Sequence, residues 1–234
     1  MSDSAADVHL TSGPISGDWL VVGWFTPDYY KLAAHFSANL TEHGIPFHLW
    51  LKPKLGKGWN TLRKPSVVLE TMDAYPGKTL VLMDVDCRVN GDIAPATEFS
   101  GDVAITIFGR WVRLFWPPHK RLTMKVSSRV VVFRPTEGAR IFAQEWERQC
   151  KIAHYSGDEV AMGRAFLRGL QGVSFAHLNS RYSANDALGS DMVGHESAHA
   201  AMFPKPSDWL KAIEKRVFRT GRTKRAKAAR LSAP

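Results

Sequence analysis

The first half of the chain alternates between short apolar runs and segments in which apolar residues recur at helical spacing. Trp19–Phe25 and Pro46–Leu51 are short and largely apolar, which predicts buried strands. The segment between them predicts an amphipathic helix, because Thr26-Pro27-Asp28 is typical of a helix start and Gly44 of a helix end. Its apolar positions are those expected for one buried helical face: Leu32, Ala33, Phe36 and Leu40.

The same alternation continues into a second helix and a third strand. Residues 52–59 predict a basic loop, and Asn60–Tyr75 predicts a helix that tolerates Pro65 near its first turn. Pro76-Gly77 then precedes the apolar run Thr79–Met83, which predicts another buried strand. Strand, helix, strand, helix and strand in this order predict a parallel sheet covered by helices.

The second half of the chain continues the α/β pattern less regularly. Further strands are predicted at Asp102–Phe108, Ser128–Arg134 and Val173–Leu178, and helices at Thr136–Cys150 and Asp158–Leu170. An aromatic and basic segment separates the first two of these strands, and irregular structure is expected after the last one up to Pro204. The pattern predicts one α/β domain over residues 18–205.

Two carboxylates, Asp84 and Asp86, follow the strand Thr79–Met83 directly. Side chains alternate along an extended chain, so we expect both carboxylates on the same side of it. Ligands bind at the carboxyl ends of strands in open α/β sheets, and buried acids need a partner or a cation. The pair therefore predicts a site for a hard divalent ion that holds phosphate oxygens. The alternative is a strand end at which two acids are merely solvated or cap a turn.

Composition is that of a soluble globular protein, with 44% hydrophobic and 23% charged residues among 234. The two cysteines, Cys87 and Cys150, make no disulfide framework, which favours a reducing, cytoplasmic location. Met1–Gly17 is polar and lacks the apolar core of a secretory signal, so we expect residues 1–17 to be disordered.

Positive charge is concentrated in a C-terminal appendage, residues 206–234, which is expected to form a basic helix and tail. Lys205 to Arg230 contains ten Lys/Arg against two acids, or +8 of the total +9, so the rest carries only +1. A nearly neutral body argues against a domain-wide nucleic-acid surface. Ser207–Phe218 combines an apolar stripe with basic residues, which suits either docking on the domain or an anionic membrane surface at the inner face.

Four motifs occur in a characteristic order along the chain. They are Phe25-Thr26 followed by Tyr29-Tyr30; Lys64 before Tyr75-Pro76 and Leu80-Val-Leu-Met-Asp-Val-Asp86; Ser127-Ser128-Arg129 before a helix with Trp146; and Gly157-Asp158-Glu159. This ordered set resembles the nucleotide-sugar-dependent glycosyltransferases of the GT-A fold, the Asp-x-Asp type of the nucleotide-diphospho-sugar transferase superfamily, and especially their retaining branch. The chain departs from the family at Ser127-Ser128-Arg129, where Asn-Ser-Gly is common.

The resemblance implies a Rossmann-like mixed sheet with helices on both faces. It implies sugar transfer from a nucleoside diphosphate, with UDP favoured, to a glycan, lipid-linked or protein acceptor, with retention and with Mn²⁺ or Mg²⁺. Asp84 and Asp86 would bind the metal together with a late histidine, for which both His195 and His199 are candidates. The nucleotide-sugar would contact the residues Thr26, Tyr29, Lys64, Asp84 and Ser128. Lys64 would touch a phosphate or a nearby acid.

Asp158 and Glu159 would hydrogen-bond sugar or acceptor hydroxyls in the same resemblance and are the candidate catalytic residues. Each of these positions also has a plain structural interpretation. Lys64 is then an exposed helix lysine, Thr26 a helix cap and Tyr29 a packed ring, whereas the two acids complement a helix N-terminus.

Three other functions remain open from the sequence. His195-Glu196-Ser197-Ala198-His199 matches the His-Glu-x-x-His pattern of zinc metallopeptidases, which requires both histidines on one face of a helix. A haloacid-dehalogenase-like phosphatase also has Asp-x-Asp after an apolar strand, although usually near the N-terminus and followed by Gly-Thr rather than Cys87-Arg88. A basic nucleic-acid-binding module is the alternative that is not an enzyme.

Overall fold

The computed structural model describes residues 9–55, 60–114, 119–152, 157–182 and 192–195, without the side chains of residues 110–123, 194 and 195. All of them belong to the compact unit Met1–Glu196. A central seven-stranded sheet has the order β1-β3-β2-β4-β7-β6-β8. Its strands are β1 (Leu10–Thr11), β2 (Trp19–Phe25), β3 (Phe47–Leu51), β4 (Thr79–Met83), β6 (Val103–Leu114), β7 (His119–Phe133) and β8 (Phe175–His177).

The sheet is mixed, as predicted for the fold class. Strands β2, β3 and β4 are parallel, β7 runs antiparallel to β4, and β8 is parallel to β6. The core strands carry the buried apolar runs that the sequence predicts, since Leu20, Val22, Leu80 and Leu82 are at most 1% exposed. Strand β1 pairs with the edge of β3, so residues 10 and 11 belong to the sheet although residues 1–17 were expected to be disordered.

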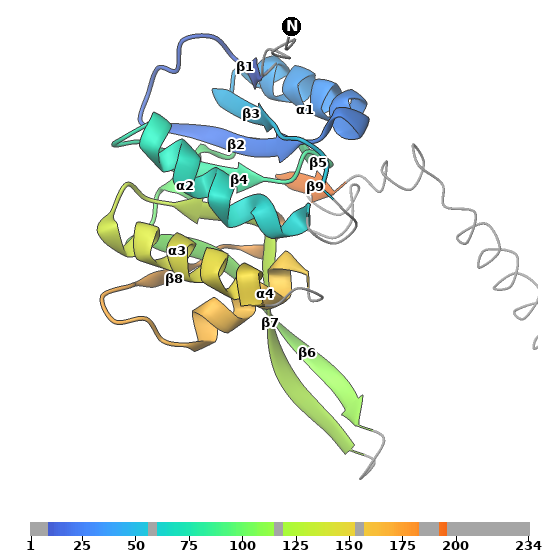
Figure 1. Ribbon diagram of the computed structural model, residues 1–234, viewed down its shortest axis with the longest axis vertical. Helices are drawn as coiled ribbons and strands as arrows, with labels where there is room; N and C mark the ends of the chain where they lie inside the picture. Colours follow the sequence, from blue (N-terminus) through green and yellow to red (C-terminus); the bar gives the residue numbers. More distant parts are fainter. Residues whose placement is uncertain (1–8, 56–59, 115–118, 153–156, 183–191, 196–234) are drawn as a thin grey trace, which may run out of the picture. The chain divides into compact units, whose positions relative to one another are not determined.

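Within the described part of the chain, four α-helices flank the sheet: α1 (Tyr30–Glu42), α2 (Lys64–Ala74), α3 (Glu137–Ile152) and α4 (Asp158–Leu167). Strands β3 and β4 lie on opposite sides of β2, so right-handed crossovers place α1 and α2 on opposite faces of the sheet. Helices α2, α3 and α4 share one apolar core over β2, β4, β6 and β7 (Figure 1). Helix α1 begins after a 3-10 turn, η1 (Pro27–Tyr29), and ends before Gly44, whose φ of +64° suits the predicted glycine stop.

A small second sheet joins β5 (Cys87–Val89) to β9 (Val193–His195) in antiparallel register. Strand β9 falls in a segment that was expected to be irregular apart from a strand end at His195. Because β5 follows the two acids directly, this sheet brings the end of the described chain beside them. No helix among the described residues is both long enough and apolar enough to cross a bilayer.

Strands β6 and β7 form a much longer hairpin than the sequence predicted. The expected strands Asp102–Phe108 and Ser128–Arg134 are only its inner part, and the aromatic and basic segment between them largely belongs to the strands themselves. The pairing shifts register between Ile105 and Thr106, where a bulge separates the inner from the outer half. The outer half extends away from the helices (Figure 1).

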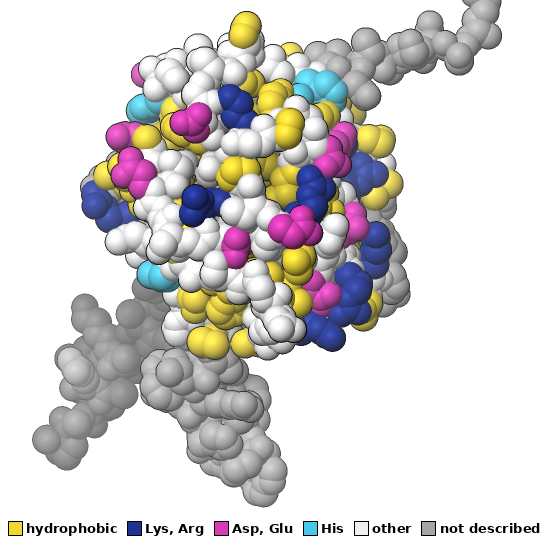
Figure 2. Space-filling view, turned by 90° about the vertical axis from the view of Figure 1, so that its left-hand side faces the viewer, with side chains coloured by type: hydrophobic (Ala, Val, Ile, Leu, Met, Phe, Trp, Pro, Cys, Tyr) yellow, Lys and Arg dark blue, Asp and Glu magenta, His cyan; other side chains and the backbone are white. Residues whose placement is uncertain are grey.

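The surface of the described body mixes charges of both signs. Basic and acidic side chains are interspersed over the face shown in Figure 2. This agrees with the nearly neutral charge of the chain outside the segment from Lys205 to Arg230.

Candidate functional site

The chain turns sharply after β4, at the first of the two acids. The Asp84 N–H donates to the Arg129 carbonyl of β7 at 3.1 Å, and the Cys87 N–H donates to the Asp84 carbonyl at 2.9 Å. This turn replaces the extended chain that was expected to put both carboxylates on one side by alternation. The two acids nevertheless remain close enough to interact, because Asp86 contributes to the raised pKa of Asp84.

Lys64 lies in the interior, beneath this turn. Its side chain is only 7% exposed, and its Nζ lies 2.7 Å from Asp84 Oδ1 and 2.7 Å from Asp158 Oδ2. The same ammonium group donates to the Ser128 carbonyl at 3.2 Å and to Ser128 Oγ at 3.3 Å. The interpretation of Lys64 as an exposed helix lysine is therefore wrong. Its position is set by α2, which begins at Lys64 and packs against β2 and β4.

Asp158 completes this cluster from the first residue of α4. Ser128 Oγ donates to Asp158 Oδ2 at 2.6 Å, and the indole N–H of Trp146 donates to the Asp158 carbonyl at 3.1 Å. Lys64, Asp84, Ser128 and Asp158 thus meet at the carboxyl end of β4, although they come from separate parts of the chain. We call these four residues the Lys64 cluster.

The electrostatics of the Lys64 cluster leave it negatively charged. Burial raises the pKa of Asp84 to about 6, and the nearby carboxylates of Asp86 and Asp158 add to this, against the opposing effect of Lys64. Burial also acts to raise the pKa of Asp158, but Lys64 and Ser128 outweigh it and the pKa is lowered. The two carboxylates likewise outweigh burial at Lys64 and raise its pKa. Within the Lys64 cluster, one ammonium group faces the two carboxylates of Asp84 and Asp158, so the cluster itself carries one excess negative charge.

Thr26 and Tyr29 lie at the carboxyl end of the neighbouring strand, β2. Thr26 is buried, and its hydroxyl donates to the Asp28 carboxylate at 2.5 Å but accepts no capping hydrogen bond from a helix N–H. Burial raises the pKa of the Tyr29 hydroxyl, and the carboxylates of Asp28 and Asp86 raise it further. Tyr29 is therefore on the Asp86 side of the site.

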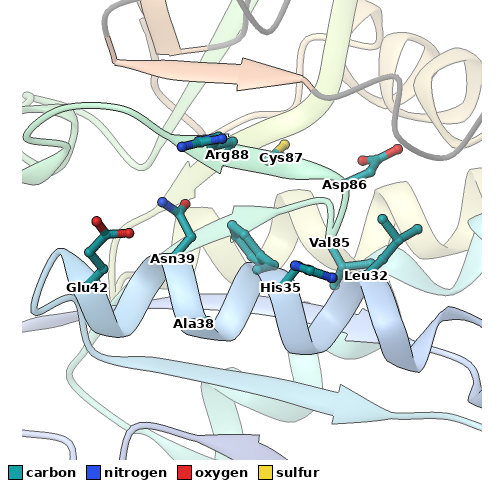
Figure 3. A pocket seen from close by; sticks show the side chains of 10 residues that line it. Leu32, His35, Ala38, Asn39, Glu42, Val85, Asp86, Cys87 and Arg88 are labelled. Atoms are coloured by element: carbon teal, nitrogen blue, oxygen red, sulfur yellow. The ribbon is translucent and has the colours of Figure 1, made fainter. Parts of the chain in front are cut away.

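A cleft of about 240 Å³ opens between α1 and the acid turn. Its lining includes Val85, Asp86, Cys87 and Arg88 on one side and, on α1, the residues Leu32, His35, Phe36, Ala38, Asn39 and Glu42. Figure 3 shows Asp86 near one end of the cleft and Glu42 near the other. The Asn39 side chain joins its two walls by a pair of hydrogen bonds with the Val89 backbone, of 3.0 and 2.8 Å.

Glu159 is separated from the Lys64 cluster. Its carboxylate is 31% exposed and pairs with Lys125 of β7 at 2.5 Å. The sequence did not predict that Lys125 pairs with Glu159. Nothing in the sequence near Lys125 indicates that this strand residue contacts an acid of a later helix. The hydrogen bond from Trp146 to Asp158 was also missed, although Trp146 belongs to the motif that led to the resemblance.

Of the two candidate histidine ligands, the structure describes the backbone of one only. Residue His195 closes β9 directly opposite Cys87, so the backbone brings it beside the turn that carries Asp86. Residues Glu196 and His199 lie outside the described residues. A strand ending at His195 is contrary to the helix that the His-Glu-x-x-His zinc site requires there. Among the described side chains, no group of three or more His, Cys, Asp or Glu is arranged to hold a metal ion.

No family model and no curated protein matches the sequence. Among solved structures, a glycosyltransferase involved in the glycosylation of the major capsid of PBCV-1 has a TM-score of 0.56 at 10% identity, covering 77% of this chain and 95% of that one. The fold is GT-A-like. Two weaker likenesses are apo GlyE of Streptococcus pneumoniae TIGR4 (TM-score 0.47, 12% identity, 76% and 54% coverage) and an active-site mutant of LgtC (0.44, 11%, 76% and 86%).

Proposed function

We propose that this protein is a glycosyltransferase that moves a sugar from a nucleoside diphosphate to an acceptor, with Mn²⁺ or Mg²⁺. The observation that supports this most strongly is the buried Lys64 cluster at the carboxyl end of β4, where ligands bind in open α/β sheets. A GT-A-like sheet around that cluster adds support. UDP as the nucleotide and retention as the stereochemical outcome rest on the sequence resemblance.

The acids suit a hard divalent ion. Asp86 and Asp84 would hold it, because carboxylate oxygens are preferred ligands of Mn²⁺ and Mg²⁺ and the site carries excess negative charge. Both Asp84 oxygens contact Lys64, at 2.7 and 3.0 Å, but a carboxylate has further lone pairs to offer. His195 is the favoured third ligand since β9 places its backbone beside the acids, and His199 is the second candidate. Such an ion would neutralise charge on the leaving diphosphate.

The remaining residues would bind and orient the donor. Thr26 and Tyr29 would contact the nucleotide, since they follow the carboxyl end of β2, which pairs in parallel with β4. Lys64 holds Asp84 and Asp158 in fixed positions, and Ser128 fixes the Asp158 carboxylate. Asp158 would then accept a hydrogen bond from a sugar hydroxyl, whereas the more exposed Glu159 would face the donor sugar or the acceptor.

The other functions considered from the sequence have less support. A zinc peptidase would need a helix where β9 ends, and a phosphatase of the haloacid-dehalogenase type would have its acids earlier in the chain. Glu196→Gln should leave sugar transfer nearly unchanged, because Glu196 has no role in it, but it would remove the general base of a peptidase. Zinc-dependent casein cleavage that is lost in Glu196→Gln would overturn the glycosyltransferase proposal.

The acceptor is a glycan, a lipid-linked glycan or a protein. The C-terminal segment is relevant to the choice between these acceptors. Lys205–Pro234 lies outside the described residues, and its charge of +8 suits an anionic membrane surface at the cytoplasmic face. Deleting it should weaken binding to anionic vesicles at low salt and spare metal-dependent donor hydrolysis. Unfolding of the truncated protein would instead show that this segment is part of the domain.

A screen of nucleotide-sugars tests the donor and metal together. Donor hydrolysis and thermal shift are measured for each sugar nucleotide with and without Mn²⁺, on the wild type, Asp86→Asn and Asp73→Asn. We expect stabilisation by UDP with Mn²⁺ and its loss in Asp86→Asn alone, because Asp73 is an exposed surface acid paired with Arg140. Full Mn²⁺-dependent turnover by Asp86→Asn would refute the metal role, and no response to any nucleotide-sugar would refute the function.

A further inference from the structure

Beyond the pair Ile107 and Val126, the outer half of the β6–β7 hairpin leaves the hydrophobic core. Near the body, Ile105 and Val126 are at most 3% exposed, and Gly163 of α4 packs close to Val126. Farther out, Met124 is already 60% exposed, and the strands continue beyond the flanking helices (Figure 1). This part of the hairpin needs no apolar residues for the core of its own domain.

The hairpin is nevertheless both basic and apolar. Val103–Phe133 contains no acidic residue, whereas Arg110, Arg113, Lys120, Arg121 and Lys125 lie in its outer half. Lys125 is engaged by Glu159 of α4, and the other four are farther from the body. Since the rest of the chain before the C-terminal segment is nearly neutral, this hairpin is a local positive patch that favours an anionic partner.

The strand register places Arg113 and Lys120 on one face of the hairpin and Arg110 and Arg121 on the other. Arg113 pairs directly with Lys120, and two cationic residues placed opposite each other destabilise an antiparallel pair. A bound anion would remove that repulsion. On the face of Arg113 and Lys120, the next pair toward the body is Trp111 with Leu122. The pair after it on the same face is Gly109 with Met124. One face of the hairpin thus carries an apolar row that ends in a basic pair.

We propose that this hairpin face docks on an anionic lipid surface. Basic residues next to apolar ones suit the boundary between headgroup phosphates and acyl chains. A nucleic acid also supplies phosphates, and Trp111 could stack on a base, but its neighbours Leu122 and Met124 are aliphatic and match acyl chains better than bases. Strand β7 continues directly to Ser128, so docking would hold the Lys64 cluster at a fixed distance from the bilayer. The inference does not depend on the sugar-transfer proposal.

Vesicle co-sedimentation of the full-length protein tests this docking. The vesicles are phosphatidylcholine alone or phosphatidylcholine mixed with phosphatidylglycerol. The wild type is compared with Arg113→Glu/Lys120→Glu and with a control of equal net charge, Lys31→Glu/Lys78→Glu. We expect binding only to the mixed vesicles, about thirtyfold or more weaker in the hairpin variant and little changed in the control. Equal binding by both variants would assign vesicle binding to the C-terminal segment and overturn the proposal.

A probe on the hairpin gives a second, independent measurement. Leu122→Cys is labelled with an environment-sensitive fluorophore, while the native Cys87 and Cys150 are only 5% and 3% exposed and so protected from the reagent. We expect a blue shift with phosphatidylglycerol vesicles and none with phosphatidylcholine. Unshifted emission would contradict the proposal even if the double variant failed to fold. A shift with a single-stranded oligonucleotide, but not with vesicles, would identify a nucleic-acid surface instead.

Discussion

The ammonium nitrogen of Lys64 lies 2.7 Å from a carboxylate oxygen of Asp158, although the two residues begin different helices, α2 and α4. Because Lys64 also contacts Asp84, this one side chain joins both helices to the turn after β4. An ion pair of this kind is costly to break from one side, since the remaining charges stay buried. The geometry of the candidate site and the stability of the fold therefore depend on the same residue.

Replacing Lys64 by methionine tests this dependence. Lys64→Met keeps the volume but leaves the Asp84 and Asp158 carboxylates without their cation, so we expect a loss of about 3–5 kcal/mol in the free energy of unfolding. Urea denaturation at neutral pH measures it. Lys54→Met is the matched control, since Lys54 is 61% exposed in its pair with Asp28 and should change stability by less than about 1 kcal/mol. Similar effects in both variants would contradict the role given to Lys64.

Asp158→Asn separates charge from shape at the same site. The amide retains a hydrogen-bonding oxygen for Ser128 but removes one of the two carboxylates around Lys64. We expect turnover to fall on the order of 10²-fold in donor hydrolysis, with the fold retained. Glu70→Gln, which removes an exposed acid paired with Lys52, should keep wild-type turnover. Wild-type turnover in Asp158→Asn would remove Asp158 from the candidate catalytic residues.

His48 predicts a loss of stability in acid. Its ring is 8% exposed, stacks on Trp50 with centroids 4.0 Å apart and shares a 2.7 Å hydrogen bond with the Tyr75 hydroxyl. Burial, helped by nearby His9 and Lys52, lowers the pKa of His48 from 6.5 to about 4. Below pH 6.5 the unfolded chain therefore binds a proton that the folded chain excludes. His48 therefore leaves the free energy of unfolding unchanged above that pH and lowers it by about 3 kcal/mol once the pH reaches 4.

Thermal or urea unfolding between pH 4 and pH 7.5 measures this effect. His48→Phe should show a smaller stability loss over that range than the wild type, whatever its stability at neutral pH. His9→Gln is the control for the neighbouring ring, which lies 5.2 Å from that of His48. Parallel pH profiles for the wild type and His48→Phe would show that His48 does not cause the acid sensitivity.

Gly23 of β2 is predicted to set the position of the acid turn. A Cβ at Gly23 would lie 2.9 Å from the Met83 carbonyl oxygen and 3.1 Å from Leu49 Cδ2, so Gly23→Ala must displace the strand end that precedes Asp84. We expect a loss of about 1–3 kcal/mol together with weaker donor binding. Gly163→Ala is the control, since its Cβ would meet Val126 at an ordinary 3.5 Å and alanine is the better helix former. Unchanged stability in Gly23→Ala would show that the strands adjust freely.

Local patterns in the sequence were enough to predict most of the sheet and its helices. Strand β4 matches the predicted Thr79–Met83, β2 matches Trp19–Phe25, and α1 ends at Glu42, just before the predicted glycine stop Gly44. A continuous apolar run is visible in the local sequence, and it is enough to predict a buried strand. The length of the β6–β7 hairpin was not predicted, because its outer strands mix basic and apolar residues and are held by cross-strand pairing instead of a core.

The sequence by itself determined which residues are candidates at the site, and the tertiary structure decided how they are connected. Asp84 and Asp86 could be found from their place after an apolar strand, since position along a strand is encoded locally. Two other features could not be found from the sequence: the burial of Lys64 between Asp84 and Asp158, and the pairing of Glu159 with Lys125. These contacts join segments far apart in the chain, and only the packing of α2 and α4 on one sheet brings their charges within hydrogen-bonding distance.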